Sequence, residues 1–316
     1  MNPGGMLYNI LSLGVPVSVA LLLASLGEMF NQRAGVFNLG CEGIMCMGAF
    51  LAFLPPYFIK TGALAPYGNL IGFAVAIAAG VLLGLLFALV TVTFRADQGI
   101  AGIGLQLFGW GLSGTLFRHY VGGVTGVEGL AAWALPGLSR IPFLGGILFN
   151  HNPMVYFTFL MVPASWYLLY RTPWGLKVRA VGTAPRAADS MGINVNRVRY
   201  QALMLGGAMA GLGGAYLSLC QARMFADDLV AGRGFIAVAL VYFGGWSPVG
   251  ILGGALLFSF AQSLQLAIQV GGIKFPYEFA VMLPYVLVIL VLSLARKSRL
   301  RGPSQLGIPF NREMRY

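Results

Sequence analysis

Charged residues are scarce in this sequence, and acidic residues are the scarcest. Among 316 residues there are 20 Lys and Arg but only nine Asp and Glu, so 9% of the chain is charged, whereas 58% is hydrophobic and the mean hydropathy is +0.80. A soluble domain carries about 25% charged residues, so this chain lacks the polar groups that cover a water-facing surface. The composition argues against a soluble enzyme, a nucleic-acid-binding module and a disordered chain, and it indicates an integral membrane protein.

Residues that catalyse reactions or hold metals are also few. The chain has two histidines and three cysteines, which are His119, His151, Cys41, Cys46 and Cys220. They form no CxxC, Cys/His or HExxH pattern, and no GxxxxGK[ST] motif occurs. We therefore expect no catalytic residue, no metal site and no cofactor in this chain, which disfavours an intramembrane enzyme. The cysteines are interpreted as small apolar packing residues.

Long apolar runs are what the sequence has in abundance. A bilayer core of about 30 Å needs roughly 20 apolar helical residues, and the runs lack the alternation of a membrane barrel. Nine segments fit: 8–27, 36–59, 69–94, 99–117, 153–170, 200–222, 234–246, 249–270 and 279–295. Segment 234–246 is too short to cross a bilayer unless it is extended or broken. We predict an all-α, polytopic helical membrane protein with about nine (eight to ten) spans, broken or re-entrant helices included, forming a single domain over 1–316.

Basic residues gather in two segments that orient the chain. The loop 171–199 and the tail 296–316 together hold 12 of the 20: Arg171, Lys177, Arg179, Arg186, Arg197, Arg199, Arg296, Lys297, Arg299, Arg301, Arg312 and Arg315. Cytoplasmic segments are enriched in Lys and Arg, so we expect both segments in the cytoplasm and the N-terminus outside. The loop 118–152, with two basic residues, is expected to be external. Because the first basic residue is Arg33, the first apolar run lacks the positive region of a cleaved signal.

Polar side chains within the spans are costly and are therefore candidate functional residues. Asn38 and Glu42 stand four residues apart, on one helix face. They either line a cavity or stabilise a break in the helix; Glu42 could accept hydrogen bonds from a neighbouring broken helix or pair with Arg33. Gln106 and Trp110 repeat the spacing, and Trp110 could stack on a solute or mark the membrane interface.

A second polar stripe lies in the segment 249–270. Spacings of three to four connect Ser259, Gln262, Gln265 or Leu266, and Gln269. Uncharged amides suit a neutral hydroxylated solute, although hydrogen bonds between helices explain them equally well. These residues, with Asn38, Glu42, Gln106 and Trp110, make up the candidate translocation path. The 45 glycines, such as the pair Gly207 and Gly211, predict close helix packing.

The loop 171–199 contains two predicted short helices. Pro173 and Gly182 bracket a basic helix, Pro185 opens a second one, and Gly192 ends it, which is the usual punctuation of helices by proline and glycine. The second helix has no lipid-spanning length. It is therefore expected to dock on a cytoplasmic protein, or alternatively to lie on an anionic membrane surface.

Two stretches, GEMFNQRAGVFNLGCEGIMCMGAF (27–50) and GLKVRAVGTAPRAADSMGINV (175–195), together resemble the permease subunits of bacterial ABC importers of the branched-chain amino acid and ribose class. Within that class the chain looks most like simple-sugar or nucleoside importer permeases. The family motif is matched by Arg33, Ala34, Gly35, Val36, Asn38, Gly40, Glu42 and Gly43. Asn31 and Gln32 stand where Ser and Glu are usual, which removes an acidic partner for Arg33. Thr183 and Ala184 stand where Glu and Asn are more common, so the local helix cap is expected to differ.

The resemblance implies a function and a set of partners. The family's coupling helix, which sits in a groove of the ATPase subunit, carries over to Ala184, Pro185, Arg186, Ala187, Ala188, Asp189, Ser190, Met191 and Gly192. ATP and Mg would be bound by a separate ATPase subunit. A second, paralogous permease and an extracytoplasmic solute-binding protein would complete an importer of the bacterial cytoplasmic membrane. We expect the chain to carry a neutral solute, a nucleoside or a simple sugar.

Two further interpretations stay open from the sequence. A stand-alone secondary transporter or channel for a small polar solute would need an intramembrane relay of charged residues, for which Glu42 is the one candidate. Independently, the segment 34–50 has a loose counterpart at 230–245 with the opposite membrane direction. Inverted repeats with broken helices are common in transporters.

Overall fold

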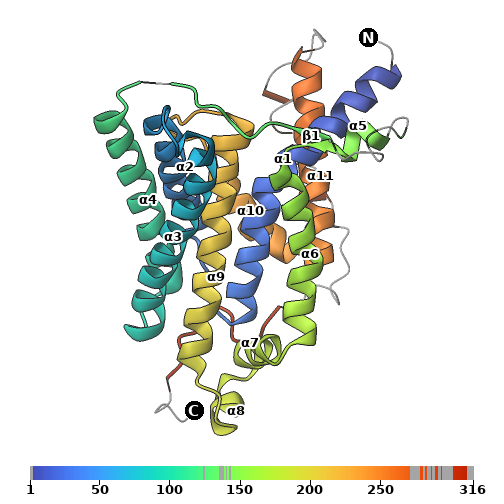
Figure 1. Cartoon of the computed structure of the whole chain (residues 1–316). Helices are drawn as coiled ribbons and strands as arrows, with labels where there is room; N and C mark the ends of the chain where they lie inside the picture. The colour runs from blue at the N-terminus through green and yellow to red at the C-terminus, as the bar shows by residue number, and fades with distance from the viewer. Residues whose placement is uncertain are drawn as a thin grey trace.

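Apolar runs of the sequence form the long helices of the structure, a computed structural model that describes residues 3–123, 125–134, 144–270 and 302–311, with a few single residues and pairs at 139–141 and 278–293. The helices are α1 (Pro3–Arg33), α2 (Cys41–Phe58), the 3-10 helix η1 (Ala65–Tyr67), α3 (Gly68–Ala88), α4 (Gln98–Tyr120), α5 (Leu144–Leu148), α6 (Pro153–Arg171), α7 (Pro173–Thr183), α8 (Pro185–Ser190), α9 (Val195–Tyr216), α10 (Arg233–Phe243) and α11 (Pro248–Val270) (Figure 1). The π-helical turns η2 (Leu89–Thr93) and η4 (Leu217–Gln221) extend α3 and α9. Two short strands, β1 (Trp133–Ala134) and β2 (Asn150–His151), pair in antiparallel fashion.

Six helices among the described residues are long and apolar enough to cross a membrane. They cover Ile10–Arg33, Cys41–Phe58, Ala65–Thr93, Gln98–Tyr120, Val195–Gln221 and Pro248–Gln269. The polytopic helical fold is therefore confirmed, whereas the count of nine spans is not. Helix α6 is 19 residues long but is not among the six, since it contains tyrosine, tryptophan and proline. The predicted ninth span, 279–295, and the six basic residues of the tail lie largely or wholly outside the described residues.

Several predicted boundaries need correction. The predicted loop 171–199 is shorter in the structure, because Arg171 ends α6 and α9 begins at Val195. Segment 36–59 is helical from Cys41 onward, and segment 234–246 becomes the 11-residue helix α10. Gly182 lies inside the last turn of α7 rather than after it. Hydropathy alone locates an apolar run, but the caps and turns at its ends decide where the helix begins.

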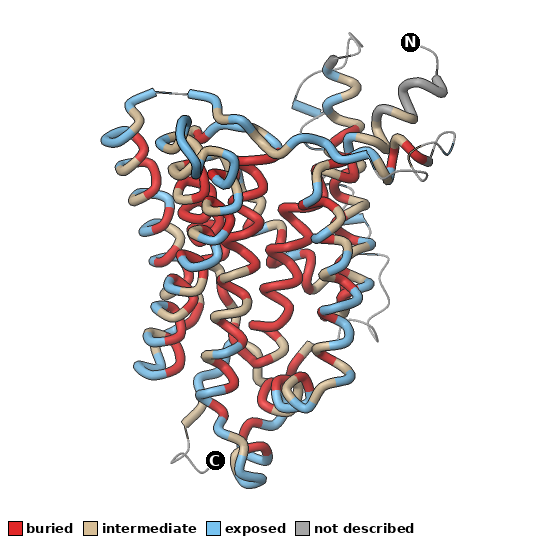
Figure 2. The backbone as a smooth tube through the Cα atoms, viewed as in Figure 1, coloured by how far each residue is buried: buried red, intermediate tan, exposed pale blue. Residues whose placement is uncertain are grey.

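Helix α9 is the centre of the bundle, and its glycines explain how neighbours approach it. It packs against α1, α2 and α3, and buried residues run along it and along α1 and α10, whereas α4 and α6 carry more exposed residues (Figure 2). Gly207 lies against the backbone oxygen of Gly80, and Gly211 lies against that of Ala76. A side chain at either glycine would collide with α3, so the predicted close packing at this pair is confirmed.

The two ends of the bundle carry different extra elements. The long connection after α4, with β1 and α5, lies at one end, and α7 and α8 lie at the other (Figure 1). The ion pair between Arg118 and Asp227, 2.6 Å, ties the end of α4 to the connection before α10. This arrangement agrees with the predicted placement of the loops 118–152 and 171–199 on opposite sides of the membrane.

Candidate functional site

The helices α2 and α10 both begin inside the bundle and run in opposite directions. Helix α2 starts after a non-helical stretch that follows Gly35, and Gly232 directly precedes the first residue of α10; both glycines have positive φ, 84° and 79°. Glycine adopts a positive φ without strain because it has no Cβ atom. Each of the two helices is thus preceded by a non-helical segment that enters the bundle, one from either end. This arrangement matches the loose inverted similarity of segments 34–50 and 230–245.

Glu42 joins the starts of these two helices. Its carboxylate accepts hydrogen bonds from the backbone N–H of Gly232, at 2.7 Å, and of Gly234, at 2.5 Å. The side chain is 5% exposed. A carboxylate is stabilised at a helix N-terminus because the first N–H groups lack helical partners and the helix dipole is positive there. Of the predicted alternatives for Glu42, hydrogen bonding to a neighbouring broken helix is confirmed.

Glu28 organises the turn between α1 and α2. Its buried carboxylate, 1% exposed, accepts from Asn31 Nδ2 at 2.8 Å, from Gln32 Nε2 at 3.1 Å and from the backbone N–H of Asn38 at 3.1 Å. Gln98 supports the same stretch by accepting from the backbone N–H of Phe37 at 2.7 Å. These bonds satisfy the backbone groups of a non-helical segment that hydrocarbon would leave unpaired.

Arg33 finds its partners at the far end of α10. It donates from Nε and Nη2 to the backbone oxygen of Trp246, at 3.0 and 2.8 Å, and the indole N–H of Trp246 donates to Gln32 at 2.8 Å. Arg33 therefore does not pair with Glu42, so that alternative is wrong. The amides Asn31 and Gln32, which replace the usual family residues, are used instead as partners of Glu28 and Trp246.

The structure brings some of the candidate path residues together and separates others. Asn38 is buried and lies in the turn stabilised by Glu28, and Gly43, next to Glu42, contacts the backbone of Gln106. The polar residues Asn38, Glu42 and Gln106 therefore lie in one region of the bundle, where α2 packs on α4. Trp110, also on α4, is 50% exposed.

The polar stripe of α11 lies elsewhere. Ser259 is fully buried, Gln262 and Gln265 are half-buried, and Gln269 is exposed. Helix α11 packs on α1, α10 and α6, on the opposite side of the bundle from α4 (Figure 1). Within this chain, the two sets of candidate residues do not form one continuous lining.

Helix α8 projects from the end of the bundle between α7 and α9. Pro185 and Ala188 are the buried residues of α8 and Asp189 is partly buried, whereas the remaining predicted coupling residues are exposed: Ala184, Arg186, Ala187, Ser190, Met191 and Gly192. Met191, at 82% exposure, stands at the tip. Gly192 has a φ of 80°, which ends the helix as predicted.

The N-terminus of α8 has no side-chain cap. This agrees with the prediction, made from Thr183 and Ala184, that the local helix cap differs from that of the family. Ala184 occupies the N-cap position and offers no side-chain hydrogen bond. The hydroxyl of Thr183 bonds backward to Arg179, while its backbone oxygen accepts from Ser304 at 2.7 Å. A segment beyond the last predicted span therefore contributes to this end of the molecule.

Three functional features were not predicted from the sequence. Glu28 could have been identified from the sequence, because it is an acidic residue at the end of an apolar run. Arg199 is buried at 1% exposure although it was assigned to the basic loop, and residues 302–311 have no hydropathy or periodicity that predicts docking.

Comparison with known proteins gives one family and several full-length relatives. The family described as "Branched-chain amino acid transport system / permease component" matches residues 10–292. The guanosine ABC transporter permease protein NupQ of Bacillus subtilis is 37% identical over 96% of this chain and 98% of its own. The putative glucose ABC transporter permease protein TsgC13 of Haloferax volcanii is 36% identical over 97% and 98%. The nucleoside ABC transporter permease protein NupC of Lactococcus lactis is 36% identical over 88% and 89%.

Each of these three organisms contains a second permease that also matches; in Haloferax volcanii it is the glucose ABC transporter permease protein TsgB13, 26% identical over 93% of this chain. NupP of Bacillus subtilis is 25% identical over 89% of this chain, and NupB of Lactococcus lactis is 36% identical over 29% of it. NupP, NupB and TsgB13 are named for the same solutes as NupQ, NupC and TsgC13, respectively. No solved structure matches the chain.

Proposed function

The chain belongs to the family of branched-chain amino acid transport system permease components, and we propose that within this family it is the permease of a nucleoside importer. It is a transport subunit of an ABC importer and not an enzyme. The observation that supports a nucleoside as the solute is the 37% identity to a guanosine permease across nearly the whole of both chains. The 36% identity to a nucleoside permease from another genus supports the same class.

The side chains within the bundle fit a neutral, hydroxylated solute. The candidate path residues of α4 and α11 are amides, a serine and a tryptophan, with no positive or negative charge among them. Amides donate and accept hydrogen bonds, and an aromatic ring stacks on a base. Because both oxygens of Glu42 bond to the backbone of α10, its role in this proposal is to hold the half-helices rather than to bind the solute.

A simple sugar is the second candidate, since a relative named for glucose is 36% identical over 97% of the chain. The test is uptake of labelled guanosine by cells that express the complete importer, with competition by unlabelled nucleosides, glucose, ribose or leucine. Nucleosides are expected to displace the label. Transport of glucose with no competition from nucleosides would overturn the nucleoside assignment in favour of a sugar, and competition by leucine alone would overturn both.

The partners follow from the same proposal. A cytoplasmic ATPase subunit, which binds ATP and Mg, docks on α8; a paralogous permease completes the membrane part; and an extracytoplasmic solute-binding protein delivers the solute at the end that carries β1 and α5. Paired permeases in the three organisms that contain the relatives support a heterodimer. The N-terminus then lies outside the cytoplasmic membrane, and α7 and α8 lie in the cytoplasm.

Purification of the tagged chain from its native membranes tests the assembly. Recovery of an ATPase and a second permease in fixed ratio is the expected result. A chain that purifies alone and moves the solute down an ion gradient would instead be a secondary transporter.

A further inference from the structure

Residues 302–311, here called the C-terminal strap, lie across the end of the bundle that carries α8. Three hydrogen bonds join the strap to α7 and to the turn before α2: Ser304 Oγ donates to the backbone oxygen of Thr183 at 2.7 Å, the N–H of Gln305 to that of Gly182 at 3.1 Å, and the N–H of Gly307 to that of Gly35 at 3.3 Å. It therefore bridges the end of α7 and the turn that leads to α2.

Arg199 anchors the strap from beneath. Its guanidinium, buried in the first turns of α9, donates from Nη1 to the backbone oxygen of Ile308 at 3.2 Å and from Nε to that of Ala34 at 3.2 Å. Burial of an arginine is costly unless its guanidinium is hydrogen-bonded. Because the two hydrogen bonds of Arg199 offset that cost, they fix the position of the strap relative to α9 and to the end of α1.

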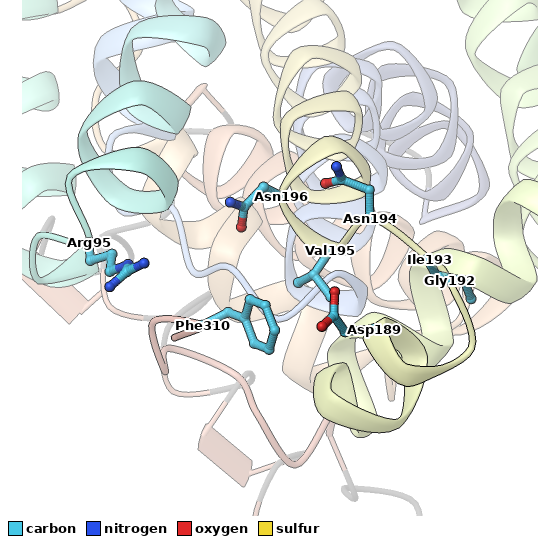
Figure 3. A pocket seen from close by; sticks show the side chains of 8 residues that line it. All are labelled: Arg95, Asp189, Gly192, Ile193, Asn194, Val195, Asn196 and Phe310. Carbon is cyan, nitrogen blue, oxygen red and sulfur yellow. The ribbon is translucent and has the colours of Figure 1, made fainter. Parts of the chain in front are cut away.

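The strap closes one side of a groove next to α8. The groove has a volume of about 490 Å³ and is lined by Asp189 of α8, the segment Gly192–Asn196, Arg95 and Phe310 of the strap (Figure 3). Asn196 and Arg95 are exposed, and Figure 3 shows the ring of Phe310 pointing from the strap toward Val195 and Asp189. Since Asp189 belongs to α8 and also lines the groove, the groove is continuous with the surface that α8 presents.

Helix α8 alone is small for a docking surface. It has six residues, of which Arg186, Ala187 and Ser190 are exposed, with Met191 following. A stable interface buries about 800 Å² on each partner and involves roughly 20–30 residues a side. An ATPase that docks on α8 must therefore contact the surfaces beside it, and the groove is the hollow adjoining α8.

We propose that α8 and the groove form one docking surface, and that the ATPase subunit inserts a projecting segment into the groove between Asn196 and Phe310. The C-terminal strap supplies the wall that makes this site. This proposal rests on the assignment of α8 as the ATPase-docking helix, and it extends that docking surface into the adjoining groove.

Filling the groove tests the proposal at one position. Asn196→Trp places a large side chain in the groove, and Asn196→Ser leaves the groove open, so the two variants form a matched pair. The importer is purified through the tagged chain, and the ATPase retained is titrated against salt. We expect about tenfold weaker ATPase binding for Asn196→Trp, as for a central interface residue, and no change for Asn196→Ser. Equal ATPase binding by the two variants would overturn the proposal.

Two truncations provide an independent measurement if the tryptophan variant fails to fold. A chain that stops after Arg301 lacks the strap, whereas one that stops after Asn311 keeps all its described contacts. Phe310→Ala removes only the wall. We expect the first truncation and Phe310→Ala to lose ATPase while retaining the second permease, and the second truncation to behave as the full chain. Full ATPase retention by Phe310→Ala and by the shorter chain would overturn the proposal.

Failure of the groove is distinguishable from failure of the proposed function. If Arg186→Glu on α8 weakens ATPase binding and the groove variants do not, the groove is no part of the interface and the assignment of α8 stands. If neither α8 nor the groove affects ATPase binding, the assignment of α8 fails as well.

Discussion

The carboxylate of Glu42 in α2 accepts a hydrogen bond from the backbone N–H of Gly234 in α10 at 2.5 Å, and it accepts a second from Gly232 at 2.7 Å. One side chain thus connects two half-helices that begin inside the bundle. Neither half-helix could leave its first N–H groups unpaired in hydrocarbon, because each unsatisfied backbone group costs several kcal/mol there. The bond therefore explains how an 11-residue helix such as α10 is stable within a membrane protein.

Glu42→Gln is expected to destabilise the start of α10. An amide offers one oxygen to the two glycine N–H groups and turns its own N–H₂ toward the other, so a buried donor loses its partner. The cost of such a loss is about 1–3 kcal/mol. We expect a lower thermal midpoint for the purified importer and reduced uptake, with the chain still inserted in the membrane.

The exposed Glu128 offers a matched control for Glu42. Glu128→Gln makes the same chemical change in the connection after α4, at a side chain that is open to solvent. It should leave both the thermal midpoint and uptake unchanged. If Glu42→Gln kept the midpoint but altered which solute is taken up, Glu42 would be a solute-binding residue and the structural role would be wrong.

The glycine contacts of α9 predict which substitutions the bundle tolerates. In Gly207→Ala the added methyl group meets the backbone oxygen of Gly80, whereas in Gly104→Ala of α4 it meets nothing within 4 Å. Overpacking costs about 1–3 kcal/mol, and alanine at an open helical site is stabilising by about 0.5–1 kcal/mol. Gly207→Ala should therefore lower the thermal midpoint and Gly104→Ala should not; equal midpoints would show that α3 and α9 separate at little cost.

The ion pair of Arg118 and Asp227 is predicted to matter little. Arg118 Nη1 and Asp227 Oδ2 are 2.6 Å apart, but the side chains are 64% and 48% exposed. Exposed ion pairs contribute about 0–1 kcal/mol to stability because solvent screens them. Asp227→Asn should leave uptake and the thermal midpoint almost unchanged at any salt concentration. Loss of uptake would show that the connection to α10 is held by this pair.

Hydropathy and helix punctuation were enough to predict the long helices, α7, α8 and the close packing at Gly207. They indicated broken helices, since segment 234–246 is too short to cross a bilayer. They could not locate the starts of α2 and α10, because an apolar run has the same composition whether or not it crosses the bilayer. The two polar stripes were predicted as one path, yet α4 and α11 lie on opposite sides of α1 and α9. Periodicity assigns residues to a helix face but not to a neighbouring helix.

The strap and Arg199 show a different limit of the sequence. Residues 302–311 form no helix or strand, and apart from the Ser304 hydroxyl the strap bonds to α7, α9 and the turn before α2 through backbone groups, which every sequence possesses. Arg199 follows Arg197 in a basic run, and nothing in the run distinguishes the exposed arginine from the buried one. Such contacts depend on tertiary packing, which fixes them only when the helices are in place.

Charge reversal at two positions of one loop separates the two interpretations of α8. Arg186 on α8 and Lys177 on α7 are both exposed, both basic and on the same side of the protein. Attraction to an anionic membrane surface depends on charge near the surface, so Arg186→Glu and Lys177→Glu would weaken it alike. Docking on the ATPase depends on the individual contact, so Arg186→Glu should weaken ATPase binding about tenfold while Lys177→Glu leaves it unchanged. The measurement is ATPase retained on the purified complex as salt is raised, and equal loss in both variants would favour a helix that lies on lipid.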